Sequence, residues 1–138
     1  MTAPVFVDTN VLIYAVDEAH PKKHEAAKLW RSELWKSRRG RISFQVLQEF
    51  YANVSQKWPA ARQQAQAEVR NLLAWRPVVV DAEVLEQAWK IQDRYQLSFW
   101  DALILRSAQA SQCSVLWSED LQNGQRWGNL EVRNPFTG

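Results

Sequence analysis

Four acidic residues of this chain stand at positions where an α/β fold gathers functional side chains. They are Asp8 at the end of the run VFV, Glu49 in FQVLQEF, Asp101 in FWDALIL and Asp120 in WSED. Carboxylates brought together at one edge of a sheet repel one another, and some stay protonated at pH 7 unless a cation joins them. Mg²⁺ prefers oxygen ligands and resolves this conflict. We therefore predict a Mg²⁺ site.

Each of these acids also has an ordinary structural explanation. Asp8 is able to cap a helix, and the spacing Ser98-x-x-Asp101 matches a capping box. Glu49 lies at the edge of an apolar helical stripe, where a rim charge is common. Asp120 in SEDLQNG suits a turn. The occurrence of all four at the expected ends of strands favours the metal site over four separate structural roles.

The composition indicates a globular protein of one domain, spanning residues 1–138. Apolar residues make up 46% of the chain, which is too many for a disordered segment. The longest unbroken apolar run, VLIYAV, is far shorter than the ~18 residues of a membrane span. The N-terminus lacks the pattern of a secretory signal. The single cysteine, Cys113, leads into an apolar run, which favours a packing role and fits a reducing cytoplasm.

Short apolar runs alternate with helical patterns along the chain. Strands are expected at 5–7, 41–43, 78–80, 114–117 and 130–133. Helices are expected over 11–17, 21–38, 44–58, 60–75, 82–95 and 99–110. Thr9 or Asn10 is expected to cap the first helix, and Pro21 to open the second. Strands separated by helices predict an α/β fold, a three-layer α/β/α sandwich around a short parallel sheet, with its ligand site at the carboxyl ends of the strands.

Charge is distributed unevenly, although the net charge is only +2. Residues 22–41 are rich in lysine and arginine, and residues 81–120 are rich in acids. A basic segment attracts phosphate backbones, so we expect Arg38, Arg39 and Arg41 to bind RNA if the substrate is RNA. His20 and His24 are four residues apart, but Pro21 places His20 outside the helix. Two unrelated surface histidines are therefore expected, not a metal-binding pair.

Four motifs in order resemble those of the PIN-domain ribonucleases, and most closely the VapC toxins of type II toxin–antitoxin systems. The motifs are VDTNVLIY, ISFQVLQEFYANV, SFWDALIL and LWSEDLQNG, which together span nearly the whole chain. The resemblance implies a small α/β/α sandwich with Mg²⁺ or Mn²⁺ at an acidic site. It also implies endonucleolytic cleavage of RNA, inhibition by a cognate antitoxin protein, and a homodimer.

The resemblance also implies roles for individual residues. Asp8, Glu49, Asp101 and Asp120 correspond to the four acids of the family, with Asp8 and Asp101 as principal metal ligands. Ser118 corresponds to a hydroxyl position two residues before the last acid, which favours Asp120 over Glu119 as the fourth acid. Thr9, Asn10 and Ser118 are expected to orient the carboxylates. Attack by metal-activated water would leave a 5′-phosphate and a 3′-hydroxyl.

Other folds that gather acids at strand ends fit less well. A phospho-receiver domain needs a lysine after the last strand, and EVRNPF has none. A phosphatase with a D-x-D nucleophile is excluded at this site because Asn10 stands at the second position. The alternative that stays open is a non-catalytic RNA- or protein-binding module of the same fold.

Overall fold

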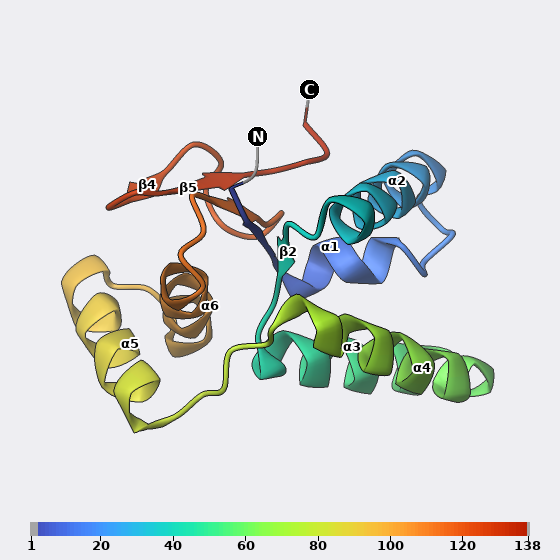
Figure 1. Cartoon of the computed structure of the whole chain (residues 1–138), viewed down its shortest axis with the longest axis horizontal. Coiled ribbons are helices and arrows are strands. Elements are labelled where there is room, and N and C mark those ends of the chain that lie inside the picture. Colours follow the sequence, from blue (N-terminus) through green and yellow to red (C-terminus); the bar gives the residue numbers. More distant parts are fainter. Residues whose placement is uncertain (1–2, 138) are drawn as a thin grey trace.

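The computed structural model describes residues 3–137 and shows a mixed α/β fold (Figure 1). Within these residues five strands make one sheet in the order β2-β1-β3-β5-β4. The strands are β1 Val5–Val7, β2 Gly40–Arg41, β3 Val115–Trp117, β4 Arg126–Trp127 and β5 Leu130–Arg133. β1 pairs in parallel with β2 and β3, and β3 pairs in parallel with β5. The predicted parallel sheet is confirmed for these four strands.

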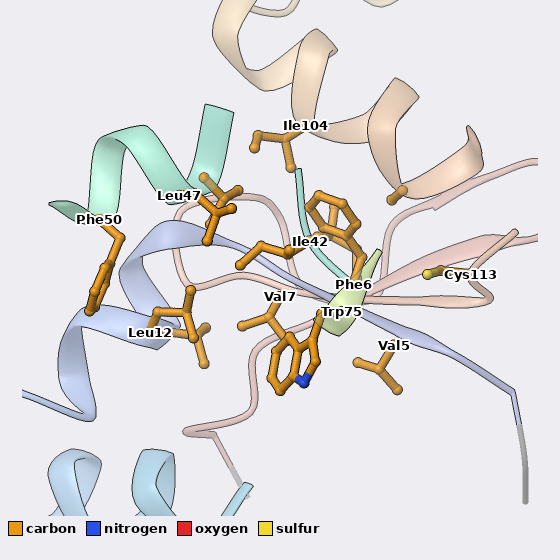
Figure 2. Packing of buried hydrophobic residues seen from close by; sticks show 14 of the residues in the cluster. Val5, Phe6, Val7, Leu12, Ile42, Leu47, Phe50, Trp75, Ile104 and Cys113 are labelled. Atoms are coloured by element: carbon orange, nitrogen blue, oxygen red, sulfur yellow. The ribbon is translucent and has the colours of Figure 1, made fainter. Parts of the chain in front are cut away.

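Helices fill the connections from β1 to β2 and from β2 to β3, whereas residues 118–129 join β3 to β5 through β4 and contain no helix. The helices are α1 Thr9–Tyr14, α2 Pro21–Ser37, α3 Phe44–Lys57, α4 Arg62–Leu72, α5 Ala82–Tyr95 and α6 Phe99–Ala110, with 3-10 turns η1 Pro59–Ala61 and η2 Leu73–Trp75 flanking α4. The step from β1 to β2 and the step from β2 to β3 cross the sheet in opposite directions. The segment between β2 and β3 reaches both faces of the sheet. Its helix α6 lies on the side of Phe6 (Figure 2), whereas Trp75 of η2 lies with Val7 and the α2 residue Leu34 on the other side. On that side Arg31 of α2 also pairs with Glu68 of α4 at 2.7 Å. Helices therefore cover both faces of the sheet. None of the helices within residues 3–137 has the length and apolar character that crossing a membrane requires.

The interior strand β1, between β2 and β3, is buried on both faces, which explains why its sequence is continuously apolar. Figure 2 shows Phe6 on the side of α6, near Ile104, and Val5 and Val7 on the other side, near Trp75. The Trp75 ring packs against Gly40 at the start of β2, where an added Cβ would lie 2.6 Å from the ring. Only glycine at position 40 allows this close approach.

The helix starts follow their sequence signals, with one correction. Pro21 is the first residue of α2, and the Ser43 and Asp81 side chains cap α3 and α5, respectively. The first helix begins at Thr9, so the expected cap by Thr9 or Asn10 is wrong. Asp8 is the N-cap, because its extended backbone lets the carboxylate accept the Thr9 N–H.

The predicted strand at 78–80 is also wrong. Val78 forms a single parallel bridge with Ser43: its N–H donates to the Ile42 carbonyl, and its carbonyl accepts the Phe44 N–H, both at 3.0 Å. The chain then turns into α5, because the Asp81 N–H donates to the Val79 carbonyl at 3.1 Å. This turn ends the pairing after one residue.

The sheet has one antiparallel edge strand, β4, that sequence patterns did not predict. It pairs with β5 through a two-residue connection, Gly128 and Asn129, and Gly128 has φ +60°. A glycine and an asparagine between two short runs are a hairpin signal. The strand is only two residues long, which is too short for alternation to be recognised in the sequence.

Candidate functional site

Asp8 lies at the carboxyl end of β1 and is only 8% exposed. Its Oδ1 accepts the Thr9 N–H at 2.7 Å, and its Oδ2 accepts the Ser118 hydroxyl at 2.8 Å. Burial raises the pKa of the Asp8 carboxyl from 3.8 to about 6; the hydrogen bonds from Ser118 and Thr9 oppose the rise, and the charges of Asp120 and Glu49 add to it. Asp8 therefore caps α1 and also carries a charge that its protein surroundings do not fully stabilise.

Glu49 lies on α3 and is tied to the start of α1. The Thr9 hydroxyl donates to Glu49 Oε1 at 2.7 Å, which fixes the orientation of the carboxylate. Gln45 and Asn53 lie four residues before and after Glu49, on the same face of the helix. The Asn53 amide donates to the Glu49 backbone carbonyl at 2.7 Å. One face of α3 thus presents an acid between two amides.

Asp101 lies in the first turn of α6, whose N-cap is Ser98. The Ser98 hydroxyl accepts the Asp101 N–H at 3.1 Å, so the serine half of the capping box is present. In the part of the chain that the structure describes, the only capping bond here is this one, and the Asp101 carboxylate lines a pocket. The carboxylate therefore stays available to a ligand.

The loop after β3 separates two neighbouring acids. The Ser118 hydroxyl accepts the N–H groups of Asp120 and Leu121 at 3.2 and 3.3 Å, while it donates to Asp8. This arrangement directs Asp120 to the pocket that Asp8 also lines.

Glu119 faces a different set of partners. Its carboxylate accepts the Tyr14 hydroxyl at 2.7 Å and forms an ion pair with Lys23 at 2.6 Å. Burial raises the pKa of the Glu119 carboxyl, but the hydrogen bonds from Lys23 and Tyr14 outweigh burial and bring the pKa below its ordinary value. Its N–H donates to Asn10 Oδ1 at 3.1 Å, which anchors the loop. Glu119 therefore has a structural role within the fold.

The four acids line one pocket of about 270 Å³. The other residues lining it are Thr9, Asn10, Ile13, Gln45, Asn53, Trp100 and Ile104. None of the lining residues within 3–137 is a lysine, arginine or histidine. The negative charges in this pocket therefore have no cationic side chain among its walls to balance them.

The donor set of this pocket fits a hard divalent cation. It consists of carboxylate, hydroxyl and amide oxygens, the ligands that Mg²⁺ and Mn²⁺ accept. The acids surround a space instead of meeting at a point: among residues 3–137 no three acidic, histidine or cysteine side chains form a ready-made metal cluster. Mg²⁺ keeps several waters when it binds and is typically held by only one or two carboxylates, so an open acidic pocket suits it.

The arginines expected to bind RNA lie at the opposite end of the strands. Arg38 and Arg39 precede β2, whereas Asp8 follows β1, which runs parallel to β2. Arg38 and Arg41 line a second pocket of about 440 Å³, together with Arg76 and Trp35. Arg39 instead donates to the Ala3 carbonyl at 3.1 Å. The structure therefore does not bring the arginines to the acidic pocket.

The two histidines have separate surroundings. His20 precedes α2 and packs edge-on against Tyr14, with ring centroids 5.6 Å apart. A ring nitrogen of His24 lies 2.9 Å from the Tyr14 carbonyl oxygen. These contacts do not make a metal-binding pair.

Sequence reasoning missed three polar or aromatic residues of the acidic pocket: Gln45, Asn53 and Trp100. Helical periodicity around Glu49 was a signal for the two amides, since both lie one turn away from it. For Trp100 the signal was weaker, because a tryptophan beside an apolar helix is more often part of the core.

The sequence motifs and the structure define the same class of fold. It is a mostly parallel sheet with acids gathered at the carboxyl ends of its strands. The PIN domain family matches residues 5–122, and the chain belongs to this family. The resemblance predicted from the four motifs is thereby confirmed. None of the curated proteins matches the sequence.

Solved structures of toxin proteins share the fold. A toxin–antitoxin complex from Klebsiella pneumoniae is 19% identical, with a TM-score of 0.66 over 95% of this chain and 97% of that one. VapC20 from Mycobacterium tuberculosis, a toxin that cleaves the sarcin–ricin loop, is 25% identical, with a TM-score of 0.65 over 84% and 91%. VapBC2 from Rickettsia felis, bound to a promoter DNA fragment, is 19% identical, with a TM-score of 0.62 over 94% and 96%.

Proposed function

We propose that this chain is a metal-dependent endoribonuclease and the toxin of a toxin–antitoxin pair. The observation that carries the proposal is the acidic pocket, to which four segments distant in the sequence each contribute one carboxylate. Membership in the PIN family and the similarity to VapC20 support a ribonuclease.

In this proposal Asp8 and Asp101 hold Mg²⁺ or Mn²⁺, and Glu49 and Asp120 complete the site directly or through water. When bound, the ion supplies the Lewis acidity for attack of water on a phosphodiester, which leaves 5′-phosphate and 3′-hydroxyl ends. The neighbouring residues act by orientation. Ser118 holds the Asp8 carboxylate at 2.8 Å, and Thr9 holds that of Glu49 at 2.7 Å.

Asn10 contacts both Asp8 and the loop that carries Asp120. Its Oδ1 accepts the Glu119 N–H, and its amide nitrogen lies 3.4 Å from Asp8 Oδ2. It therefore links the strand end that carries Asp8 to the loop that carries Asp120.

The test is whether the purified protein cuts RNA in the presence of Mg²⁺ or Mn²⁺ and stops when a chelator removes the ion. Identification of the new ends as 5′-phosphate and 3′-hydroxyl would support water attack. The competing function is a non-catalytic PIN-fold binding module, which would retain RNA or protein without cutting RNA under either condition.

The second pocket is proposed to bind the RNA backbone at a distance from the cut. Replacing Arg38, Arg41 and Arg76 with Gln should weaken binding of long RNA and flatten its salt dependence, because each lost phosphate contact lowers the slope of log K against log salt by ~0.7–0.9. Cleavage of an oligomer too short to leave the acidic pocket should be unchanged. Filter binding over a salt series measures both effects.

Arg39→Gln is the matched control for this prediction, since Arg39 does not line the second pocket; its guanidinium donates to the Ala3 carbonyl and lies 3.8 Å from Glu33. It should leave the salt slope nearly unchanged. If the triple variant has the same slope of log K against log salt as the wild type, the three arginines are solvated surface residues that do not bind RNA.

Apolar surface supports two further proposals, a homodimer and an antitoxin partner in the cytoplasm. Leu29 is 70% exposed and Val79 62% exposed. A groove of about 370 Å³ between α3 and α4, lined by Leu47, Tyr51 and Val69 among others, suits an antitoxin helix or strand. Sedimentation should show a dimer at micromolar protein concentration. A strict monomer there would contradict the dimer.

A further inference from the structure

The walls of the acidic pocket include residues other than the four acids. Ile13 and Ile104 give it apolar walls, and Trp100 and Gln45 line it from α6 and α3. Trp100 is 61% exposed, whereas Gln45 is only 6% exposed. A flat ligand with a polar edge fits this combination of an apolar surface, an aromatic ring and a buried amide beside an acidic site.

Trp100 is an exposed indole held in position. The Phe99 ring packs against it in a T-shaped arrangement, with centroids 5.1 Å apart. Phe99 in turn packs against the buried cluster formed by Val84, Ala88, Ala102 and Leu103. Tryptophan normally buries a large apolar area, and a flat ring fixed at the edge of a pocket serves as a stacking surface.

Gln45 carries a polar atom that the described residues leave without a partner. Its Oε1 is buried and forms no hydrogen bond within residues 3–137. Buried side-chain amides are nearly always paired, and of the buried polar atoms without a partner among the described residues only Gln45 Oε1 belongs to a residue that lines this pocket.

We propose that Trp100 and Gln45 form a nucleobase subsite of the acidic pocket, in which Trp100 stacks on an unpaired base next to the scissile phosphate and the Gln45 amide hydrogen-bonds the edge of that base. The proposal rests on the ribonuclease function proposed above and makes it more specific. Stacking on Trp100 requires an unpaired base, because bases inside a duplex are already stacked and paired. A perfect RNA duplex is accordingly a poor substrate.

The test combines a protein substitution with a substrate change. The substrates are a short RNA oligomer without self-complementarity and the same oligomer with an abasic nucleotide beside the mapped cut. Trp100→Ala should lower kcat/KM on the intact oligomer about tenfold or more, the scale of one lost base stack. The abasic change should cost the wild type a similar factor and cost Trp100→Ala nothing further. Trp100→Phe should keep most of the activity.

Trp89→Ala is the matched control, since Trp89 is 45% exposed on α5 and does not line the pocket. It should behave as wild type on both oligomers. Equal sensitivity of wild type and Trp100→Ala to the abasic change would overturn the subsite. A wild type that cuts no RNA in Mg²⁺ would instead overturn the proposed function. In that case fluorescence anisotropy would measure how wild type and Trp100→Ala bind the intact and the abasic oligomer. This comparison would test the subsite independently of cleavage.

Gln45 is tested separately with Gln45→Leu. Because Oε1 has no partner within the described residues, the thermal midpoint should stay the same or rise, while the relative cleavage of oligomers that differ in the base beside the cut changes. A lower midpoint with unchanged base preference would assign Gln45 to the fold and remove it from the subsite.

Discussion

Replacing Asp8 with Asn is expected to lower RNA cleavage by about 10²-fold or more, the scale of a lost catalytic electrostatic group, and to make the metal-free protein more stable at neutral pH. Burial raises the pKa of Asp8 from 3.8 to about 6, so the ionised form costs the fold about 3 kcal/mol. Asn removes this cost. Loss of the hydrogen bond from Ser118 offsets about 1 kcal/mol of the gain.

The gain in stability should depend on pH with a definite sign. Below the ordinary pKa of 3.8, Asp8 is protonated in both the folded and the unfolded chain, and Asn relieves nothing. As the pH rises from 3.8 to about 6 the unfolded chain loses this proton while the folded chain keeps it, so this group makes the wild type progressively less stable. Above about 6 the full cost applies, and the difference between Asp8→Asn and wild type reaches its maximum.

Denaturant unfolding in a chelator, at pH values on either side of this window, measures the stability, and a cleavage assay measures the function. Asp101→Asn should lose cleavage to a similar extent. Asp93→Asn is the matched control, because Asp93 is an exposed acid of α5 that does not line the pocket. Full cleavage by both Asp8→Asn and Asp101→Asn would contradict a catalytic role for these two acids.

Removal of divalent ions is expected to abolish cleavage, and return of Mn²⁺ is expected both to restore it and to raise the thermal midpoint. A ligand that binds only the folded chain, at 100 times its Kd, stabilises by about 3 kcal/mol, or roughly 10 °C for a domain of this size. The ion needs the Asp8 carboxylate ionised, so its stabilising effect should grow as the pH rises through about 6. The metal-free protein shows the opposite trend for this group.

Differential scanning with and without Mn²⁺, at pH values below and above the pKa of Asp8, tests this prediction. Asp8→Asn should show a much smaller midpoint shift, and Asp93→Asn the same shift as wild type. Cleavage that continues in excess chelator, together with an unmoved midpoint, would exclude a metal site in the pocket.

Much of the fold could be predicted because its signals are local. Pro21, Ser43 and Ser98 mark helix starts through groups within a few residues of themselves, and the structure confirms all three starts. The strand VFV was recognisable because a strand buried on both faces is continuously apolar. The run at 78–80 has the same appearance. Only the turn at Asp81 and the lack of a second pairing residue distinguish it, and these depend on tertiary contacts.

The acids of the candidate site could be named from the sequence, because order along an α/β chain determines which residues reach the carboxyl ends of the strands. Their roles as metal ligands stay a prediction. Three features depended on the tertiary structure. The first is the reason for a choice that the spacing from Ser118 to Asp120 already favoured: Tyr14 and Lys23 hold Glu119 in the fold, so that Asp120 is the acid of this loop that lines the pocket.

The position of the basic segment was the second feature. Arg41 lies in β2 and lines the same second pocket as Arg38. Arg38 is close in sequence to the helix that carries Glu49, but it precedes β2 while that helix follows it. The strand β2 therefore separates Arg38 from Glu49 and places them at opposite ends of the parallel strands. Sequence distance does not report this separation, because the direction of a strand is fixed only by its pairing with its neighbours.

The third feature was the environment of Gln45 and Trp100. Glutamine in a buried helix and tryptophan in an apolar helix are ordinary residue types. Their functional interpretation depends on the pocket wall that they share with the acids. Sequence by itself determined which residues carry charge, where most helices begin and that VFV forms a buried strand, since those depend on side-chain type and neighbours along the chain. Tertiary structure alone decided which side chains face one pocket and how deeply Asp8 is buried, because both follow from contacts between segments far apart in the chain.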